Sequence, residues 1–270
     1  MKLTIKVPGS CGELVQGMFN GAPCLITCPI NLFSTVTITD EFTGFHGIGW
    51  KSKLMIRQML KQFKCDNFNF GIELKSDLPR GKGMASSSAD IAAVAKAIAL
   101  ALNIDINVDL IVKASTNIEP TDGIFYDGIV AMNPLTGKLL SRLTPLPKYK
   151  IAIFDFGGKV DTLKVKCRSH FCLSEIPKTL ELNIMIQSAL ANQQIIYKPQ
   201  LEEIISFSKS IGALGINAAR TGTVIGIFFD ESIKLSEIIN RVNMISERFK
   251  HIKLLNITNL IDGGFYINGE

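Results

Sequence analysis

A glycine-rich turn that ends in three serines and runs straight into an apolar helix is the feature that most constrains this chain. It covers residues 78–89, with the sequence LPRGKGMASSSA, and residues 90–102 hold mainly alanine, leucine and isoleucine without glycine or proline. Gly81 and Gly83 allow positive φ angles and a close approach of the main chain to a ligand. The serines stand where a helix N-cap is expected. Because the first N–H groups of a helix lack internal acceptors and the helix dipole is positive there, the turn predicts an anion site, most simply for phosphate.

Spacing excludes two common phosphate loops. The Walker A loop ends in Gly-Lys-Ser/Thr, whereas Lys82 lies between the two glycines. The pattern Gly-x-Gly-x-x-Gly fails because residue 86 is serine. An ordinary loop that caps a buried helix is the alternative on composition alone.

The order of residues in this loop resembles the second signature of the GHMP kinases, Pro-x-Gly-x-Gly-[Leu/Met]-[Gly/Ala]-Ser-Ser-[Ser/Ala]-Ala. In that family the loop wraps the nucleotide phosphates, so the resemblance implies that ATP is bound here. Met84 and Ala85 replace the usual leucine and glycine, and alanine at 85 predicts a less extreme backbone angle. The ATP-binding residues that the resemblance implies are Pro79, Arg80, Gly81, Lys82, Gly83, Met84, Ala85, Ser86, Ser87 and Ser88.

Composition limits the class of protein. A chain of 270 residues with 47% hydrophobic residues can build one large domain or two modest ones. The formal charge of +5 is too small and too dispersed to indicate nucleic acid. Six scattered cysteines predict reduced structural thiols rather than disulfides or zinc ligands. The N-terminus lacks a signal peptide and the most apolar run is short for a membrane span, so the cytoplasm and no membrane partner are expected.

The hydrophobic pattern predicts an α+β protein with a boundary near residue 146. Strands are expected over 2–7, 32–39, 68–75, 128–133, 139–143, 149–155, 223–229 and 264–268. Helices are expected over 51–63, 89–102, 108–117, 178–193, 199–211 and 231–247. The resemblance implies the two-lobed GHMP kinase fold: a ribosomal-S5-like N-terminal domain over 1–146 and a ferredoxin-like C-terminal domain over 147–270.

A second motif follows the first predicted strand. Residues 7–17 read VPGSCGELVQG, which is similar to the first motif of homoserine kinases. The narrower form Ser-Cys-Gly-Glu-Leu-[Val/Ile]-Gln-Gly resembles the L-threonine kinases of cobalamin synthesis. That resemblance implies that Ser10, Cys11 and Glu13 lie near the substrate and the γ-phosphate. A tight turn with a solvated Glu13 is the alternative.

Two further segments complete the predicted site. Residues 215–226, GINAARTGTVIG, resemble the third family motif in its threonine-kinase form and imply substrate contacts from Arg220, Thr221 and Gly222. Arginine stands at 220 where close relatives carry histidine, and it can hold phosphate. Residues 157–162, GGKVDT, resemble the same subgroup, so Asp161 is expected either to pair with a substrate ammonium or to cap a helix. A plain turn before a strand is the alternative for the first segment.

The turn Glu119-Pro120-Thr121-Asp122-Gly123 resembles the region that holds the catalytic aspartate in many GHMP kinases. Asp122 is the expected base or hydroxyl orienter, with Thr121 beside the substrate. Glu119 and a serine of the loop, Ser87 or Ser86, are expected to hold Mg²⁺. A surface turn is the alternative, and homoserine kinases lack a true base, so Asp122 could orient the hydroxyl without accepting its proton.

Together these motifs favour an ATP-dependent kinase that converts L-threonine to O-phospho-L-threonine for the aminopropanol linker of cobalamin. A homoserine kinase or another small-metabolite kinase of the family is the nearest alternative. A catalytically silent nucleotide or metabolite sensor on the same fold is the second. The expected partners are ATP and the small substrate, with no nucleic acid; a homodimer is left open.

Overall fold

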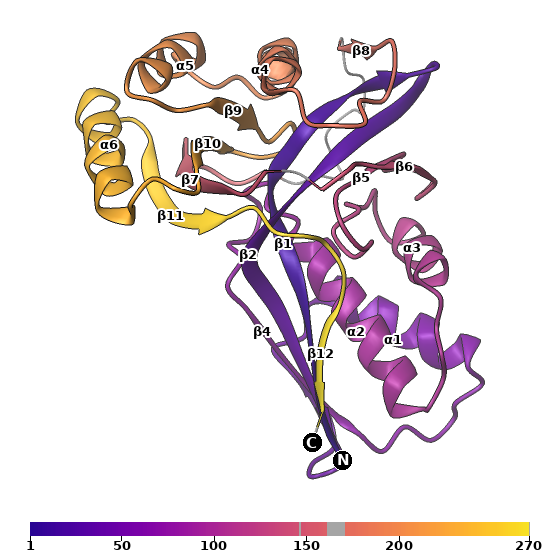
Figure 1. The fold of residues 1–270 in the computed structure, drawn as a ribbon. Helices are drawn as coiled ribbons and strands as arrows, with labels where there is room; N and C mark the ends of the chain where they lie inside the picture. The colour runs from indigo at the N-terminus through magenta and orange to yellow at the C-terminus, as the bar shows by residue number, and fades with distance from the viewer. Residues whose placement is uncertain (146, 161–170, 270) are drawn as a thin grey trace.

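The computed structural model describes residues 1–145, 147–160 and 171–269 as two β-sheets with helices packed against them (Figure 1). The first sheet has the strand order β12-β1-β2-β4-β3, with β5 and β8 attached to its long central strands and β6 paired with β5. Its strands are β1 (Lys2–Phe19), β2 (Ala22–Thr39), β3 (Gly44–His46), β4 (Gly71–Ser76), β5 (Val130–Met132), β6 (Leu139–Arg142), β8 (Cys172–Leu173) and β12 (Tyr266–Gly269).

The long hairpin of β1 and β2 forms the centre of the first sheet. The two strands pair from Lys2↔Thr39 to Phe19↔Ala22, around a two-residue turn in which Asn20 and Gly21 both have positive φ. The sequence prediction that strand 1 stops at residue 7 was wrong. Proline and glycine in residues 8–17 look like strand breakers, but the structure absorbs them in three register shifts and keeps the strand continuous. The motif at residues 7–17 therefore lies within β1, and its interpretation as a tight turn was wrong.

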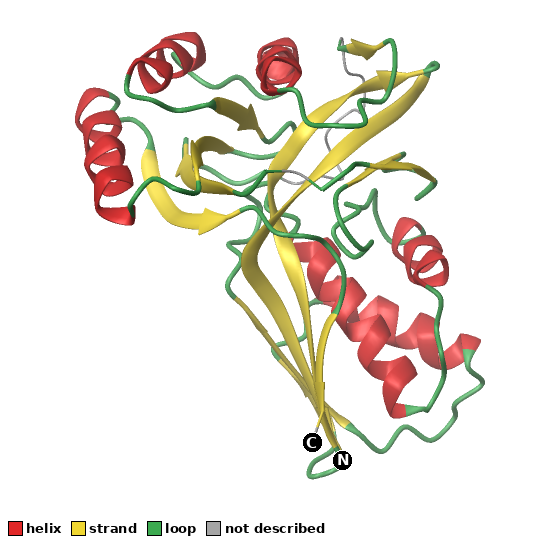
Figure 2. Ribbon diagram, in the orientation of Figure 1, coloured by secondary structure: helices red, strands yellow, loops and turns green. Residues whose placement is uncertain are grey.

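Three helices cover one face of the first sheet (Figure 2). They are α1 (Trp50–Gln62), α2 (Ser86–Ala101) and α3 (Val108–Thr116). The central helix, α2, is buried along almost its whole length, because its alanines let it lie close to α1 and the β1–β2 hairpin. The sequence predicted its start three residues late, at 89. The serines are its first turn rather than its cap.

The second sheet is antiparallel and has the order β11-β7-β10-β9. Its elements are β7 (Tyr149–Asp155), α4 (Leu182–Ala191), the 3₁₀ turn η2 (Asn192–Gln194), α5 (Leu201–Ser210), β9 (Gly215–Ala218), β10 (Val224–Asp230), α6 (Leu235–Arg248) and β11 (Lys253–Asn259). The order along the sheet is 4-1-3-2 in chain sequence, the ferredoxin-like arrangement, so the α+β fold class is confirmed. The sequence missed β9 and β11. The domain boundary at 146 stays a prediction, and β8 and β12 from the later half join the first sheet.

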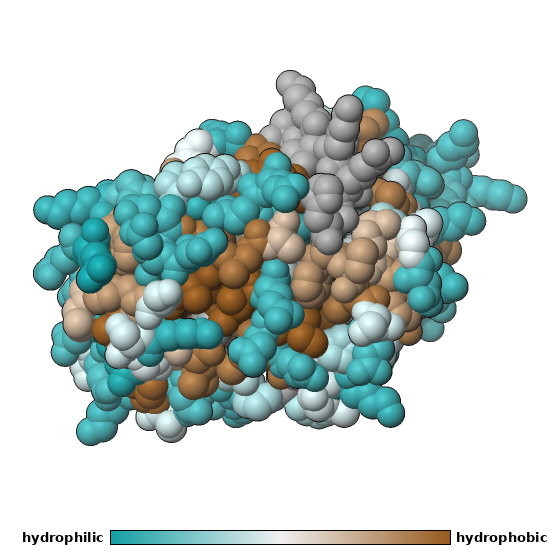
Figure 3. All heavy atoms as spheres, turned by 90° about the horizontal axis from the view of Figure 1, so that it is seen from above, coloured by the Kyte–Doolittle hydropathy of each residue, from teal (hydrophilic) through white to brown (hydrophobic). Residues whose placement is uncertain are grey.

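Part of the exposed surface is apolar. Figure 3 looks down on the molecule from above and shows apolar side chains gathered in the middle of the view, with polar side chains around them. The exposed large apolar residues of α6 are Leu235, Ile239 and Met244. A homodimer stays a prediction.

In the described parts of the chain, every helix is too short or too polar to cross a membrane.

Candidate active site

The loop before α2 has the backbone conformation of a ligand cradle. Gly81 and Gly83 have φ of +74° and +80°. Ala85, the residue before the helix, also lies in the left-handed region, at φ +53°, a less extreme angle than that of either glycine. A Cβ on Gly83 would lie 2.7 Å from both the Ala219 Cβ and the Gly222 Cα. Only glycine fits there, and the first turn of α2 is held with its N–H groups at the end of the loop.

Main-chain hydrogen bonds fasten this loop to both lobes. Ser10 and Gly12 of β1 donate their N–H groups to the carbonyls of Met84 and Gly83, each at 3.1 Å. The N–H of Thr223, in the turn between β9 and β10, donates to the Lys82 carbonyl at 3.0 Å. The three family-like motifs, far apart in sequence, therefore meet at one place.

The Lys82 side chain points toward the second lobe. Its Nζ lies 2.5 Å from Asp155 Oδ2 and 2.7 Å from the Gly158 carbonyl. The other Asp155 oxygen accepts from Thr223 Oγ1 at 2.5 Å. The predicted phosphate contact of Lys82 is thus replaced in this structure by an ion pair that links the loop to the end of β7.

A cavity of about 280 Å³ opens beside the loop. Its lining includes the following predicted site residues: Arg80, Gly81, Gly83, Met84, Ala85, Ser86, Ser87, Ser88, Glu119, Thr121, Asp122, Glu13, Arg220 and Thr221. Five predicted residues do not line it: Pro79, Lys82, Ser10, Cys11 and Gly222. Asp161 lies outside the described residues.

Ser10, Cys11 and Gly222 support the cavity from behind. The Ser10 hydroxyl donates to the carbonyls of Gly12 and Cys28, and the Cys11 thiol is fully buried beside Asn217. Burial raises the pKa of Cys11, which keeps it a thiol. Gly222 packs on the main chain of Lys82 and Gly83. None of these three residues lines the cavity, and their predicted contact with the substrate stays a prediction.

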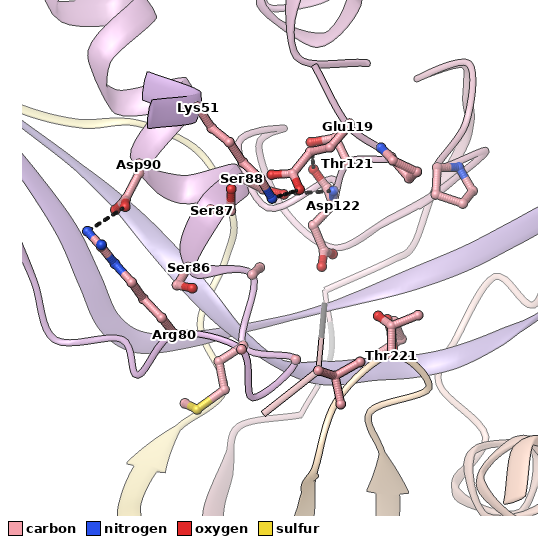
Figure 4. Close-up of a pocket in the computed structure, with 18 of the residues that line it drawn as sticks. Lys51, Arg80, Ser86, Ser87, Ser88, Asp90, Glu119, Thr121, Asp122 and Thr221 are labelled. Carbon is pink, nitrogen blue, oxygen red and sulfur yellow. Dashed lines mark hydrogen bonds and ion pairs between the residues drawn. The ribbon is translucent and has the colours of Figure 1, made fainter. Parts of the chain in front are cut away.

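Asp122 is the acidic group best placed for chemistry. Its N–H donates to Ser88 Oγ at 3.4 Å, which ties its loop to the first turn of α2. Figure 4 shows its carboxylate directed into the space between that turn and Thr221. The Oδ1 atom is buried and has no hydrogen-bond partner among the described residues. Burial, and secondly the negative charge of Glu13, raise the pKa of Asp122 well above its ordinary value.

Glu13 lies on the same side of the cavity, beside Arg220. The Arg220 N–H donates to Glu13 Oε2 at 3.2 Å. Burial raises the pKa of Glu13, while the charges of Arg220 and Lys198 oppose that rise. We call the four residues Glu13, Gln16, Asp122 and Arg220 the carboxylate wall, since all of them line the cavity.

Glu119 and Lys51 form a largely buried ion pair at the edge of the cavity (Figure 4). One Glu119 oxygen contacts Lys51 Nζ, and the other, Oε1, is buried without a hydrogen-bond partner among the described residues. Sequence analysis assigned Lys51 only to a helix. Its position at the start of α1, next to the single tryptophan of the chain, was the available signal.

Asp90 and Gln16 also line the cavity, although the sequence analysis gave neither residue a role in the site. Asp90 lies 3.9 Å from Arg80 and accepts from Ser34 Oγ at 2.5 Å. Burial raises the pKa of Asp90. Gln16 stands inside the quoted first motif, yet no role was assigned to it. The signal for Asp90 was an acidic residue directly after the serines.

Comparison with known proteins agrees with the motifs. Residues 51–127 match the model of the GHMP kinases N-terminal domain. The L-threonine kinase of Citrobacter freundii is 25% identical over 250 residues, covering 83% of this chain and 85% of that protein. The L-threonine kinase of Salmonella typhimurium is 23% identical over 282 residues, covering 95% and 93%. The crystal structure of homoserine kinase from Cytophaga hutchinsonii superposes with a TM-score of 0.61 at 16% identity, covering 99% of this chain and 97% of that one.

Proposed function

We propose that this chain, which is similar to GHMP kinases in sequence and fold, is an ATP-dependent kinase for the side-chain hydroxyl of L-threonine. The product is O-phospho-L-threonine, which would serve the aminopropanol linker of cobalamin. Both named relatives are L-threonine kinases, and they cover most of this chain.

One observation carries the proposal. Asp122 Oδ1 is a buried acceptor without a partner among the described residues, and it lines the same cavity as the first turn of α2. A hydroxyl between the two would be aligned for attack on a phosphate held at the helix N-terminus. A raised pKa makes the ionised Asp122 carboxylate a stronger proton acceptor.

The phosphate loop provides the charge stabilisation. Residues 86–88 form the first turn of α2 and line the cavity, and the N–H groups of a first helical turn lack internal acceptors at the positive end of the helix dipole. Groups fixed in this way stabilise the charge that develops on the transferred phosphoryl group.

The donor set beside the loop fits Mg²⁺. Glu119 offers an unpartnered buried oxygen among the described residues, and Ser87 offers a hydroxyl in the same cavity. Mg²⁺ usually needs only one or two protein ligands, because phosphate oxygens and water molecules complete its coordination shell. When bound, it would neutralise phosphate charge. Lys51 holds Glu119 in position from the other side.

In the proposed reaction Asp122 orients the threonine hydroxyl and takes its proton as the oxygen attacks the γ-phosphorus. The bond from that phosphorus to the β–γ bridging oxygen breaks, and ADP leaves. A positioned carboxylate that takes the proton contributes about 10²–10⁴ in rate. The remaining acceleration comes from alignment and from the loop.

Release of ADP measured with a panel of L-threonine, L-serine and L-homoserine tests the proposal, with phosphorus NMR to identify the product. Phosphothreonine formed fastest supports it. Phosphohomoserine formed much faster favours the homoserine kinase alternative. Binding of ATP without ADP release for any acceptor would favour the sensor.

A further inference from the structure

We infer that Gln16 selects substrates that carry an α-ammonium group, because its side-chain carbonyl accepts a hydrogen bond from that ammonium. The inference rests on the proposed function and assigns a specificity-determining residue within the proposed site.

The strand register places Gln16 and Glu13 on one face. Glu13 pairs with Thr27 and Gln16 pairs with Leu25. Thr27 and Leu25 are two residues apart on β2, so their side chains share a face, and their partners on β1 share it too. Residues three apart on a regular strand would face opposite ways. The register shift between Glu13 and Val15 adds one residue to β1 and turns Gln16 toward the cavity.

The main chain of Gln16 is clamped from the second lobe. Its N–H donates to Ser188 Oγ at 2.8 Å, and the same hydroxyl donates back to the Gln16 carbonyl at 2.9 Å. Asn192 Nδ2 donates to that carbonyl as well, also at 2.9 Å. These partners lie on α4 and η2, and both are buried. The clamp fixes the residue while leaving its side chain to the cavity.

The Gln16 side chain carries an unused acceptor. The residue is 6% exposed, and its Oε1 is buried with no hydrogen-bond partner among the described residues. A buried polar atom without a partner costs free energy, so such an atom in a cavity wall indicates a ligand donor. Together with Asp122 Oδ1, it gives the carboxylate wall two unsatisfied acceptors within the described part of the chain.

The charges of the wall suit a zwitterion. Glu13 and Asp122 supply carboxylates. Burial and, secondly, the charge of Glu13 raise the pKa of Asp122, and an ammonium beside both groups would favour their ionised forms. Arg220 places a positive charge in the same wall, beside Glu13. An ammonium has three N–H donors and needs several acceptors once it leaves water. Gln16 adds a neutral acceptor without adding a third negative charge.

The experiment compares two substrates in two variants. L-Threonine has the ammonium, whereas 3-hydroxybutyrate keeps the hydroxyl and the carboxylate but lacks it. We expect Gln16→Met to raise the KM for L-threonine roughly 10- to 100-fold, the effect of losing one hydrogen bond to a charged group. Turnover of 3-hydroxybutyrate should change by less than about twofold, because that substrate never used the acceptor. Gln187→Met, on the exposed side of α4, is the matched control.

Circular dichroism and the thermal midpoint establish that Gln16→Met is folded. Ser188→Ala, which keeps Gln16 and removes part of its clamp, should also raise the KM for L-threonine selectively. Equal losses for both substrates, or no loss for either, would overturn the inference while leaving the proposed function intact. A wild-type protein that phosphorylates no hydroxy amino acid would overturn both.

Discussion

The two walls of the cavity are built from different parts of the polypeptide. The phosphate loop acts through its main chain: two glycines, a left-handed alanine and the first turn of α2. The carboxylate wall acts through buried side chains that come from β1, the loop at 119–123 and the turn between β9 and β10. A main-chain cradle binds any phosphate with the right shape, whereas side chains decide which acceptor is used. The difference predicts that substitutions on the two walls separate nucleotide binding from chemistry.

Gly83→Val should have the largest effect, because it removes nucleotide binding. Its Cβ would meet Ala219 and Gly222 at 2.7 Å, and valine has no easy access to a φ of +80°. Titration with ATP measures the loss of affinity, with calorimetry and the fluorescence of Trp50, which lines the cavity, as the two readouts. Gly157→Ala is the control, since that glycine also has positive φ but a Cβ added there would meet no atom of the described residues within 4 Å. Wild-type ATP affinity in a folded Gly83→Val protein would show that the loop is not the nucleotide site.

Asp122→Asn should lower kcat by about 10²–10⁴ and leave the KM for ATP nearly unchanged. The amide cannot accept the proton, and the phosphate loop is untouched. Steady-state kinetics with saturating acceptor provides the measurement, and the exposed Asp66→Asn is the control. A variant that keeps more than about a tenth of kcat would exclude proton abstraction, since general-base catalysis contributes more than that. Asp122 would then only position the hydroxyl.

Glu119→Gln should raise the Mg²⁺ concentration needed for half-maximal rate by roughly tenfold or more, because the variant loses an anionic ligand. The change also leaves Lys51 without its buried partner, so the stability of the variant must be measured in parallel. Glu73→Gln, at a half-buried carboxylate paired with Lys75, controls for loss of charge. An unchanged Mg²⁺ requirement would remove Glu119 from the metal site.

The sequence was most informative where one short segment carries the structure. The loop and helix at 78–102 were predicted because glycine spacing and helix composition act locally. The prediction that a serine caps the helix was wrong, because Ala85, in the left-handed conformation, is the N-cap residue and the helix begins at Ser86. The course of β1 was wrong because the register shifts that tolerate its glycines and Pro8 depend on pairing with β2. β9 was missed because its four buried residues are defined only by pairing with β10.

The carboxylate wall shows the same limit. Glu13, Asp122 and Arg220 were each named from separate motifs, but their mutual proximity depends on tertiary contacts such as the Arg220 N–H on Glu13. Gln16 lies inside the first motif and Lys51 lies next to the single tryptophan, but neither signal indicates a role in the site. Their roles follow from a register shift and from an ion pair with Glu119, 68 positions away.

The smallest expected effect concerns the free energy of unfolding and the buried Lys198, whose charge interacts with Glu13 of the carboxylate wall. Lys198 is 3% exposed, and its Nζ donates to the Ala219 carbonyl at 2.7 Å behind Glu13. Burial lowers the pKa of Lys198 to about 8, while Glu13 opposes that shift. Between pH 8 and the ordinary lysine pKa, the unfolded chain therefore binds more protons than the folded one, and the free energy of unfolding rises with pH. Relative to Lys198→Met, the wild-type protein should gain about 2 kcal/mol between pH 7 and pH 9.5. Urea unfolding of both proteins at the two pH values measures the difference, in which the titration of cysteines and tyrosines cancels. A difference that stays constant or falls with pH would mean that Lys198 keeps its proton in the folded state, held there by Glu13.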